Sequence, residues 1–182
     1  MISVRTRNLG LGLLVAAALS FAGWYTYRHF YGISEYRYPA DKQAVMKILQ
    51  DNWYMMVSES STDFSAEYEF THKSASTEYP DGSLHIFVYR KHGKPVAFST
   101  YYRSEPGVAL IQFLGVDRDY RRHGYAQTLL EHVVEHALAH GFTKARLAVR
   151  ENNVPASRLY SKLGFKEFLR DDGFIWLEKS LL

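Results

Sequence analysis

The sequence contains no cysteine, and this absence excludes several kinds of site. Without thiols the chain cannot form a disulfide, a zinc site built from thiolates or a cysteine nucleophile. A large excess of charge is also lacking, because the formal net charge is only +3. That surplus lies in residues 1–30, whose charged side chains are Arg5, Arg7 and Arg28. The rest of the chain is neutral overall, which disfavours binding to the phosphate backbone of a nucleic acid.

The composition is otherwise that of an ordinary globular protein, with 47% hydrophobic and 23% charged residues. A chain of 182 residues is long enough to bury one sizeable core. We therefore expect one domain, preceded by a short N-terminal appendage.

The appendage contains a long run without charge, residues 9–27. As a helix, this run would span about 28 Å, close to the hydrocarbon core of a bilayer at about 30 Å. Aromatic side chains, which favour the membrane interface, gather at its carboxyl end: Trp24, Tyr25 and Tyr27. We expect residues 9–27 to form a transmembrane anchor after an N-terminal tail, residues 1–8, which would make this a single-pass membrane protein.

A cleaved signal peptide is the alternative for the same segment. Arg5 and Arg7 would form its basic region and residues 9–19 its apolar region. Ser20 and Ala22 are small enough to flank a cleavage site. The sequence leaves both interpretations open.

Beyond residue 31 the hydrophobic pattern alternates between strand and helix periods. Residues 34–40 predict a short strand and residues 41–53 a helix capped by Asp41. Residues 58–83 are rich in Ser, Thr, Asp and Glu and indicate a loop or an irregular helix. The rest predicts an antiparallel meander (84–90, 95–103 and 107–116), a helix (125–140), a strand (143–150), a helix (154–164) and a closing hairpin (165–179).

The stretch at residues 121–126, RRHGYA, lies where the third meander strand is followed by a helix. The first amides of a helix lack internal partners and its dipole is positive there, so this position suits a phosphate. Gly124 would let a bulky ligand approach the backbone, and Ala126 keeps the first turn small. Arg121 and Arg122 add positive charge. Two solvated arginines before an ordinary helix are the plainer alternative.

A second motif makes the pattern more specific. About thirty residues further on, the chain reads ENNVPASRLYSKLGF, in which the spaced positions are Asn153, Ala156, Leu159, Tyr160, Gly164 and Phe165. With the Arg-x-x-Gly-x-Ala pattern of residues 121–126, this stretch resembles the GNAT superfamily of acyl-CoA-dependent N-acetyltransferases, over about residues 34–182. The resemblance implies an α/β (α+β) fold with a mixed, mainly antiparallel sheet of about six to seven strands flanked by helices.

The resemblance also implies a cofactor and its contacts. Acetyl-CoA would be the acyl donor, with no metal. Its pyrophosphate would lie on the loop and helix start, and its pantetheine arm and acyl carbonyl on the end of the preceding strand. The implied contact residues are Leu114, Gly115, Val116, Arg121, Arg122, His123, Gly124, Tyr125, Ala126, Asn153 and Tyr160.

Two of these positions would take part in the reaction. The Leu114 N–H would hold the oxyanion, and Tyr160 would protonate the departing thiolate, as the tyrosine at this place in the family does. A tyrosine on a helix beside a sheet is otherwise often only part of the core. The base that deprotonates the amine is unassigned, because the strand offers Gln112 where a carboxylate is common, flanked by Glu105 and Asp117.

Two other functions are open at this point. His132, Glu135 and His136 match the H-x-x-E-H pattern of zinc peptidases, and His140 continues the spacing, although these residues are also the polar stripe of an amphipathic helix. A GNAT-fold module that binds acyl-CoA at the membrane without turnover is the other alternative.

The acceptor is the least specified partner, and the sequence is silent on the oligomeric state. In the family the variable segment after the first helix, here residues 54–83, shapes the acceptor side. Its acidic residues are Asp63, Glu67, Glu69, Glu78 and Asp81, which suits a cationic amine of a small molecule or a peptide, although a solvated acidic loop would look the same.

Because acyl-CoA is a cytosolic metabolite, we expect the catalytic domain in the cytoplasm. Basic residues after the apolar run also favour that side: Arg28, Arg37 and Lys42.

Overall fold

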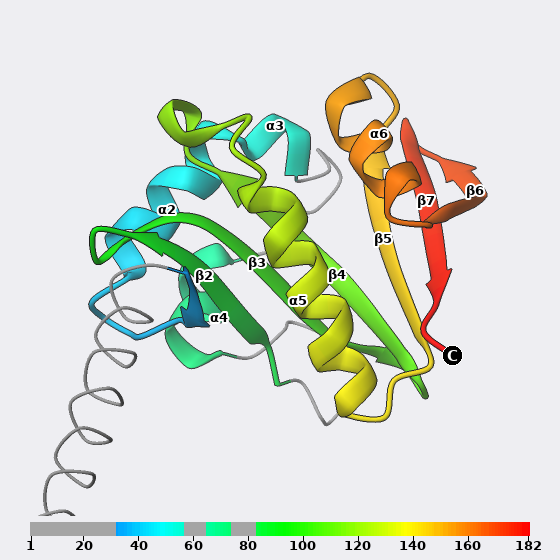
Figure 1. Ribbon diagram of the computed structural model, residues 1–182, viewed down its shortest axis with the longest axis horizontal. Helices are drawn as coiled ribbons and strands as arrows, with labels where there is room; N and C mark the ends of the chain where they lie inside the picture. The colour runs from blue at the N-terminus through cyan, green and yellow to red at the C-terminus, as the bar shows by residue number, and fades with distance from the viewer. Residues whose placement is uncertain (1–31, 57–64, 74–82) are drawn as a thin grey trace, which may run out of the picture.

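The computed structural model of the chain describes residues 32–56, 65–73 and 83–182, which form a twisted sheet covered by helices (Figure 1). The seven strands are β1 (Gly32–Glu35), β2 (His85–Lys91), β3 (Lys94–Glu105), β4 (Val108–Val116), β5 (Lys144–Arg150), β6 (Lys166–Asp171) and β7 (Phe174–Ser180). The helices are α2 (Lys42–Asp51), α3 (Trp53–Met56), α4 (Ala66–His72), α5 (Tyr125–Ala139) and α6 (Val154–Lys162), with a short 3₁₀ turn η1 (Arg118–Tyr120).

The strand order is β1-β2-β3-β4-β5-β7-β6. Within the described sheet, β4 and β5 form a parallel pair and the other neighbouring strands run antiparallel. The parallel pair needs a crossover connection, and α5 supplies it. This arrangement confirms the predicted mixed, mainly antiparallel sheet, its central meander and its closing hairpin.

Each face of the sheet has its own core. The apolar stripe of α5 packs on one face, where Leu129, Leu130 and Val133 are buried together with residues of α6. The opposite face is covered by α2, whose buried residues include Val45 and Ile48, and by α4. Figure 1 shows α5 in front of the sheet and α2 and α4 behind it. The 3.6-residue period of each helix therefore decides which side chains meet the sheet.

Two local expectations need correction. The strand predicted over 34–40 is the shorter β1, because the chain turns after Glu35 toward α2. The segment predicted as a loop or irregular helix contains the regular helix α4, which begins where the Ser65 side chain accepts a hydrogen bond from the Tyr68 amide at 3.2 Å. A helix of two turns carries too few apolar positions for its period to stand out in the sequence.

Asp41 stands at the N-cap position of α2, as predicted, but its carboxylate does not cap the helix. It accepts two hydrogen bonds from the Arg90 guanidinium, at 2.6 and 2.8 Å, and one from the Arg37 amide at 2.7 Å. Both members of the Asp41–Arg90 pair are buried. The residue thus joins α2 to the sheet.

The predicted localisation as a single-pass membrane protein is corrected by the structure. Over the described ranges, no helix has the length and apolar character needed to cross a bilayer. The longest of them, α5, has 15 residues, which span only about 22 Å against a hydrocarbon core of about 30 Å. The segment on which the prediction rested, residues 9–27, lies outside the described residues.

Candidate active site

The parallel strands β4 and β5 separate halfway along their length. They are paired from Val108 with Lys144 to Ile111 with Leu147, and the pairing stops there. Beyond Ile111 the two strands diverge, as Figure 1 shows. The second half of β4 therefore has a sheet neighbour on one side, β3, and a gap on the other.

A bulge in β4 sets the direction of the backbone groups along this gap. Phe113 pairs with Thr100 and Ile111 with Tyr101, which leaves Gln112 as an extra residue. After the bulge, the Phe113 carbonyl accepts a hydrogen bond from the Ser99 hydroxyl at 2.9 Å, and the Phe113 amide donates to Thr100 Oγ1 at 3.2 Å. Both backbone groups of Phe113 thus face β3.

Because backbone direction alternates along a strand, the N–H and C=O groups of Leu114 and Val116 face the gap. The Asp117 amide agrees with this alternation, since it donates back to the Val96 carbonyl on β3 at 2.9 Å. The strand end to which the family resemblance assigned the acyl carbonyl and the pantetheine arm therefore turns backbone groups toward the gap.

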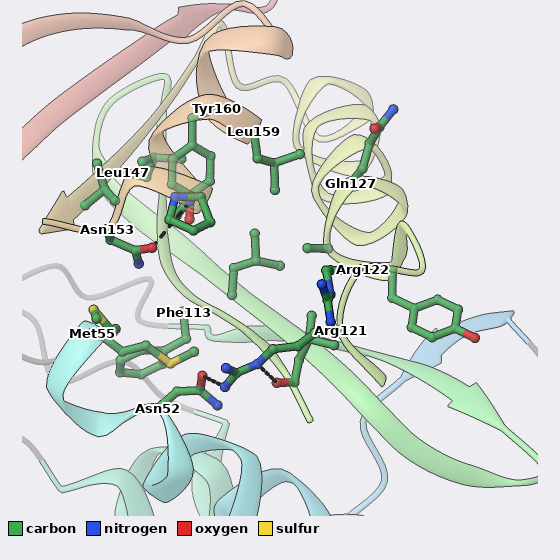
Figure 2. Close-up of a pocket in the computed structure, with 18 of the residues that line it drawn as sticks. Asn52, Met55, Phe113, Arg121, Arg122, Gln127, Leu147, Asn153, Leu159 and Tyr160 are labelled. Carbon is green, nitrogen blue, oxygen red and sulfur yellow. Dashed lines mark hydrogen bonds between the residues drawn. The ribbon is translucent and has the colours of Figure 1, made fainter. Parts of the chain in front are cut away.

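The gap opens into a cavity of about 1050 Å³. Its walls come from the turn at Asn52 with α3, the second half of β4, the segment 118–127, and β5 with α6. Figure 2 shows Tyr160 and Asn153 on one side of the cavity and Arg121 with Asn52 on the other. The two sequence motifs, about thirty residues apart, thus contribute opposite walls of one cavity.

The loop before α5 has the backbone conformation of an anion-binding turn. Arg122 and Gly124 both have positive φ, at 63° and 82°. Gly124 is the N-cap of α5, where no described side chain caps the helix. The first backbone hydrogen bond of the helix runs from the Thr128 amide to the Gly124 carbonyl, so the amides before Thr128 have no partner within the helix.

Gly124 is open on the side where a side chain would project, because nothing lies within 4 Å of an ideal Cβ there. Residues 124–127 all line the cavity, so the unpartnered amides are accessible from it. The side chains of Tyr125 and His123 stack at 5.8 Å between ring centroids, and Tyr125 also packs on Tyr89 at 4.4 Å. These rings hold the start of the helix against β2.

The two arginines of the loop differ in their contacts. Arg121 donates to Asn52 Oδ1 at 2.7 Å and to the Val116 carbonyl at 3.4 Å, so its guanidinium ties the loop to the end of β4 and to the C-cap residue of α2 (Figure 2). Arg122 is exposed on the cavity wall. Arg122 is therefore better placed to meet an entering anion, whereas Arg121 supports the wall.

The wall formed by α6 carries the other motif. Asn153 is the N-cap of α6, and its Oδ1 accepts from the Ala156 amide at 3.3 Å. Tyr160 is 8% exposed and lines the cavity. Burial raises the pKa of Tyr160 to about 12, so its hydroxyl is protonated at neutral pH and can serve as a proton donor.

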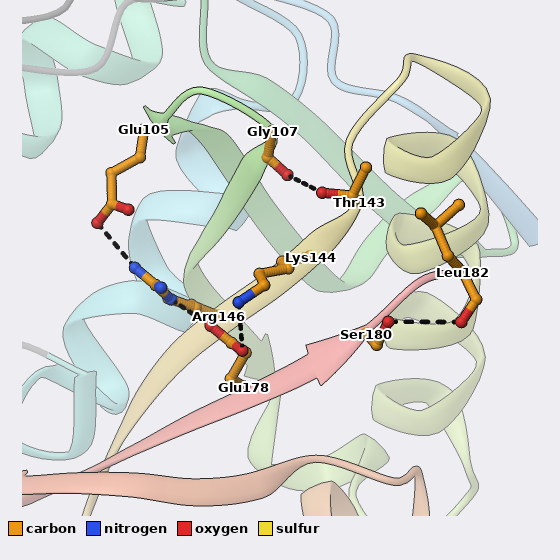
Figure 3. Close-up of polar contacts among 8 residues, drawn as sticks. All are labelled: Glu105, Gly107, Thr143, Lys144, Arg146, Glu178, Ser180 and Leu182. Carbon is orange, nitrogen blue, oxygen red and sulfur yellow. Dashed lines mark hydrogen bonds and ion pairs between the residues drawn. The ribbon is translucent and has the colours of Figure 1, made fainter.

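Three of the predicted positions lie off the cavity wall. Gly115 faces the α2 side of the sheet, where an added Cβ would come within 2.7 Å of Met56 and 2.8 Å of Phe98, so packing explains this glycine. Glu105 lies at the other end of the meander and accepts from Arg146 at 2.7 Å (Figure 3). Asp117 accepts from the Asp119 amide at 3.0 Å and so caps the η1 turn. Of the three side chains considered as the base or its relay, only Gln112 lines the cavity.

Sequence reasoning assigned residues 54–83 to the acceptor side but did not single out Asn52 and α3 as a wall of the cavity. This short helix reaches across the gap to β5, where Arg150 donates to the Tyr54 carbonyl and lies 4.4 Å over the Tyr54 ring. Met55 and Met56 face the cavity from it. No local signal marks these residues, because their role depends on β5, which lies far along the chain.

The histidines of the H-x-x-E-H pattern form part of the packing between α5 and the sheet. The His132 ring packs edge-on against Phe87 at 4.7 Å, and His136 Nδ1 lies 2.7 Å from the Tyr101 hydroxyl. They do not form the solvent-facing polar stripe expected from the sequence. In the part of the chain that the structure describes, no three His, Asp or Glu side chains are grouped to hold a metal ion.

Comparison with known proteins relates this fold to acetyltransferases. The chain is 35% identical over 81 residues to the ribosomal protein bS18-alanine N-acetyltransferase of Escherichia coli K12, covering 44% of this chain and 54% of that protein. The chain thus spans about half the length of the curated relatives that it matches. The ribosomal protein bS18-alanine N-acetyltransferase of Shigella flexneri is likewise 35% identical over 81 residues, with the same coverage of both chains.

Solved structures match over more of the chain. The crystal structure of the E. coli ribosomal-protein-S18-alanine N-acetyltransferase has a TM-score of 0.61 and 25% identity, covering 82% of this chain and 92% of that one. The ribosomal-protein-alanine N-acetyltransferase of Brucella melitensis has a TM-score of 0.65 at 18% identity, covering 81% and 98%. The PaiA N-acetyltransferase of Thermoplasma acidophilum, solved with coenzyme A, has a TM-score of 0.61 at 17% identity, covering 81% and 98%. The last two likenesses show the fold alone.

A family model describes the core of the chain. The model of the acetyltransferase (GNAT) family matches residues 43–165, which is more than half of the 182 residues. The matched range contains the strand β4 with its bulge, the loop before α5 and the motif on α6. The chain therefore belongs to the acetyltransferase (GNAT) family.

Proposed function

We propose that this protein transfers the acetyl group of acetyl-CoA to a primary amine of a small molecule, a peptide or a protein. This proposal rests on the observation that three features line the same cavity. They are the gap-facing backbone of β4, the uncapped start of α5 and the buried Tyr160. The region from residue 34 to residue 182 would be the catalytic domain. Family membership and the names of the relatives support this activity.

The residues present fit coenzyme A. The amides at the start of α5 offer donors to a pyrophosphate, and the helix dipole adds a positive potential. Gly124 leaves room for the phosphate groups, and Arg122 offers a positive charge beside them. Asn153 and Ala156 border the same cavity from α6. In this assignment His123 and Tyr125 support the loop through their stacked rings.

The chemistry needs a donor for the oxyanion and an acid for the leaving group. Acetyl-CoA supplies a thioester whose carbonyl carbon forms a bond to the amine nitrogen while the bond to sulfur breaks. The Leu114 N–H faces the gap and would donate to the carbonyl oxygen as negative charge develops there. Tyr160 would give its hydroxyl proton to the departing thiolate and then regain a proton from solvent. A cationic acceptor loses one proton to solvent before it attacks and a second proton as the amide forms, whereas a neutral amine loses only the second, so the products are an amide and free coenzyme A.

The acceptor is proposed from two observations. The relatives are named for an alanine of ribosomal protein bS18, so a peptide amine is the acceptor class to test first. Glu69, a described acidic residue in the segment assigned to the acceptor side, is compatible with a cationic amine. A small-molecule amine would meet the same requirement.

The test is acetyl transfer by the full chain. Purified protein is incubated with acetyl-CoA and a panel of peptides beginning with alanine, polyamines, aminoglycosides and amino acids. Release of free coenzyme A and an added acetyl mass on the acceptor are expected, and a peptide with a blocked N-terminus and no lysine serves as control. Tight binding of acetyl-CoA without transfer to any amine would instead support the non-catalytic module.

A further inference from the structure

The side chain of Gln112 is turned by the bulge of β4 toward the helix α4. Its Nε2 donates a hydrogen bond to Glu69 Oε2 at 3.1 Å, across 43 positions of sequence. Glu69 is buried, with 2% of its surface exposed, and it stands on the face of the sheet that α2 and α4 cover. The Gln112 amide therefore has the carboxyl group of Glu69 as its direct neighbour.

The contact with Glu69 decides which end of the Gln112 amide is bound. An ionised carboxylate accepts hydrogen bonds and donates none, so the NH₂ group of the amide must face it. The remaining atom, Gln112 Oε1, is buried and has no hydrogen-bond partner among the described residues. A buried acceptor of this kind is unusual in a folded protein and calls for a donor.

The cavity offers a route for that donor. Gln112 is one of its lining residues, as are Leu114 two positions further along β4 and Tyr160 on the opposite wall. An amine that approaches a carbonyl near Leu114 would enter the same space. The hydroxyl that neighbours Glu69 on β3, Tyr102, stays protonated, because burial and then the charge of Glu69 raise its pKa. Tyr102 therefore adds no negative charge to this corner, and Glu69 is the acidic side chain there.

We propose that Gln112 and Glu69 form the binding point for the acceptor amine. Gln112 Oε1 accepts an N–H of the amine, and Glu69 is a positioning residue that holds the amide in this orientation and favours a cationic acceptor. The inference rests on the proposed acetyl transfer, because it concerns the second substrate of that reaction. It adds the residues that select and orient the amine.

The test compares three single variants with the wild type. Gln112→Met keeps the length of the side chain and removes the acceptor oxygen, and Glu69→Gln removes the charge that orients the amide. Glu67→Gln is the matched control, since Glu67 lies on the same helix but bonds Lys42 at the exposed surface at 2.6 Å. Steady-state kinetics give KM for the amine and for acetyl-CoA, calorimetry gives Kd for coenzyme A, and thermal melting reports folding.

We expect KM for the amine to rise at least about tenfold in Gln112→Met and Glu69→Gln, which corresponds to about 1.4 kcal/mol. KM for acetyl-CoA and Kd for coenzyme A should stay within twofold of wild type, and Glu67→Gln should match wild type throughout. The double variant Glu69→Gln with Gln112→Glu restores a donor and acceptor pair with reversed roles. We expect it to recover at least part of the amine affinity.

The outcomes separate this inference from the proposed function. If the wild type acetylates an amine but Gln112→Met has an unchanged KM for it, the assignment of Gln112 is wrong. If Glu69→Gln only lowers the melting temperature, Glu69 is structural. If the Glu69→Gln variant does not fold, the kinetics of Gln112→Met and of the double variant test the assignment of the amine-binding point. Absence of transfer to every amine by the wild type would instead overturn the proposed function, and the inference with it.

Discussion

The hydroxyl of Tyr101 lies 2.7 Å from Nδ1 of His136, and this contact joins the central strand β3 to the helix α5. Tyr101 is fully buried, and His136 stacks on His140 at 4.0 Å between ring centroids. Burial, followed by the charges of His140, His85 and His132, lowers the pKa of His136 to about 4, while Glu35 opposes the shift. Burial and His140 also lower the pKa of His85. The lowered pKa values thus favour the neutral forms of His136 and His85 where the helix packs on the sheet.

We predict that the protein loses stability between about pH 6.5 and pH 4 in part through His136. Because the folded-state pKa lies below the unfolded-state value, the contribution is complete above pH 6.5 and is lost as the pH falls toward 4 and beyond. Melting temperature measured over this range should fall less steeply in His136→Gln than in wild type. His72→Gln, an exposed histidine on α4, should keep the wild-type slope. Equal slopes in all three proteins would contradict the prediction.

The loop before α5 gives a prediction for cofactor binding. Gly124→Val places a side chain in the space assigned to the phosphates and forces a branched residue to a φ of 82°. Gly141→Val is a matched control, since Gly141 has a φ of 81° at the other end of the same helix and also has open space around its Cβ. Both should lose stability on the order of 1–3 kcal/mol. Calorimetry should show at least a tenfold loss of coenzyme A affinity in Gly124→Val alone, and equal affinities would refute the assignment.

Charge reversal at Arg122 also tests the phosphate site at the loop before α5. It replaces one side chain by another and does not force a glycine position to accept a side chain. Arg122→Glu should weaken coenzyme A binding by about 1–3 kcal/mol through loss of a charged contact and added repulsion. Arg118→Glu, on the neighbouring η1 turn of the cavity wall, is the comparison. A similar loss of affinity in both variants would indicate that the positive electrostatic potential of the whole cavity wall, and not a contact at Arg122, determines the affinity for coenzyme A.

Tyr160→Phe separates chemistry from packing. The variant keeps the ring that lines the cavity and removes the proton donor, so kcat should fall about 10²- to 10⁴-fold while coenzyme A affinity stays close to wild type. Tyr36→Phe is the control, because Tyr36 is a buried tyrosine on the opposite face whose hydroxyl has no hydrogen-bond partner in the described part of the chain. It should leave kcat unchanged. Full activity of Tyr160→Phe with normal binding would show that Tyr160 is only part of the core.

The buried ion pair between Asp41 and Arg90 gives a stability prediction. Asp41→Ala leaves the Arg90 guanidinium buried without its bidentate partner, and the free energy of unfolding should drop by about 3–5 kcal/mol. Asp51→Ala at the other end of α2 breaks an exposed pair with Lys47 and should leave the free energy of unfolding nearly unchanged. Urea denaturation of the two variants measures the difference. Equal losses would mean that the Asp41–Arg90 pair contributes no more than a surface contact.

Much of the fold was accessible from local pattern. The helix at residues 125–139 and the three meander strands follow from apolar spacing, since the side chains that face a core must recur at the period of the element. The short helix α4 was missed, because a segment of two turns is too short for the helical repeat of apolar residues to be recognised. Its stability comes from the packing of Phe70 against the sheet.

For the candidate site, too, some residues were predicted from the sequence and others were not. The loop at residues 121–126 and the Tyr160 motif were found because each carries its own spacing, and both line the cavity. Glu105 was considered near the reaction because it precedes β4 in sequence, yet it bonds Arg146 at the far end of the sheet. Nearness along the chain does not predict which end of a strand faces a cavity.

The sequence by itself therefore determined the order of the elements, the two motifs and the absence of thiol chemistry, all of which depend on residue type and short spacing. The tertiary structure alone decided which distant groups meet. Glu69 reaches Gln112 across 43 positions, Arg90 reaches Asp41 across 49, and Arg121 reaches Asn52 across 69. These contacts arise because α2 and α4 pack on one face of the sheet and because the bulge of β4 redirects one side chain. No local period encodes that geometry.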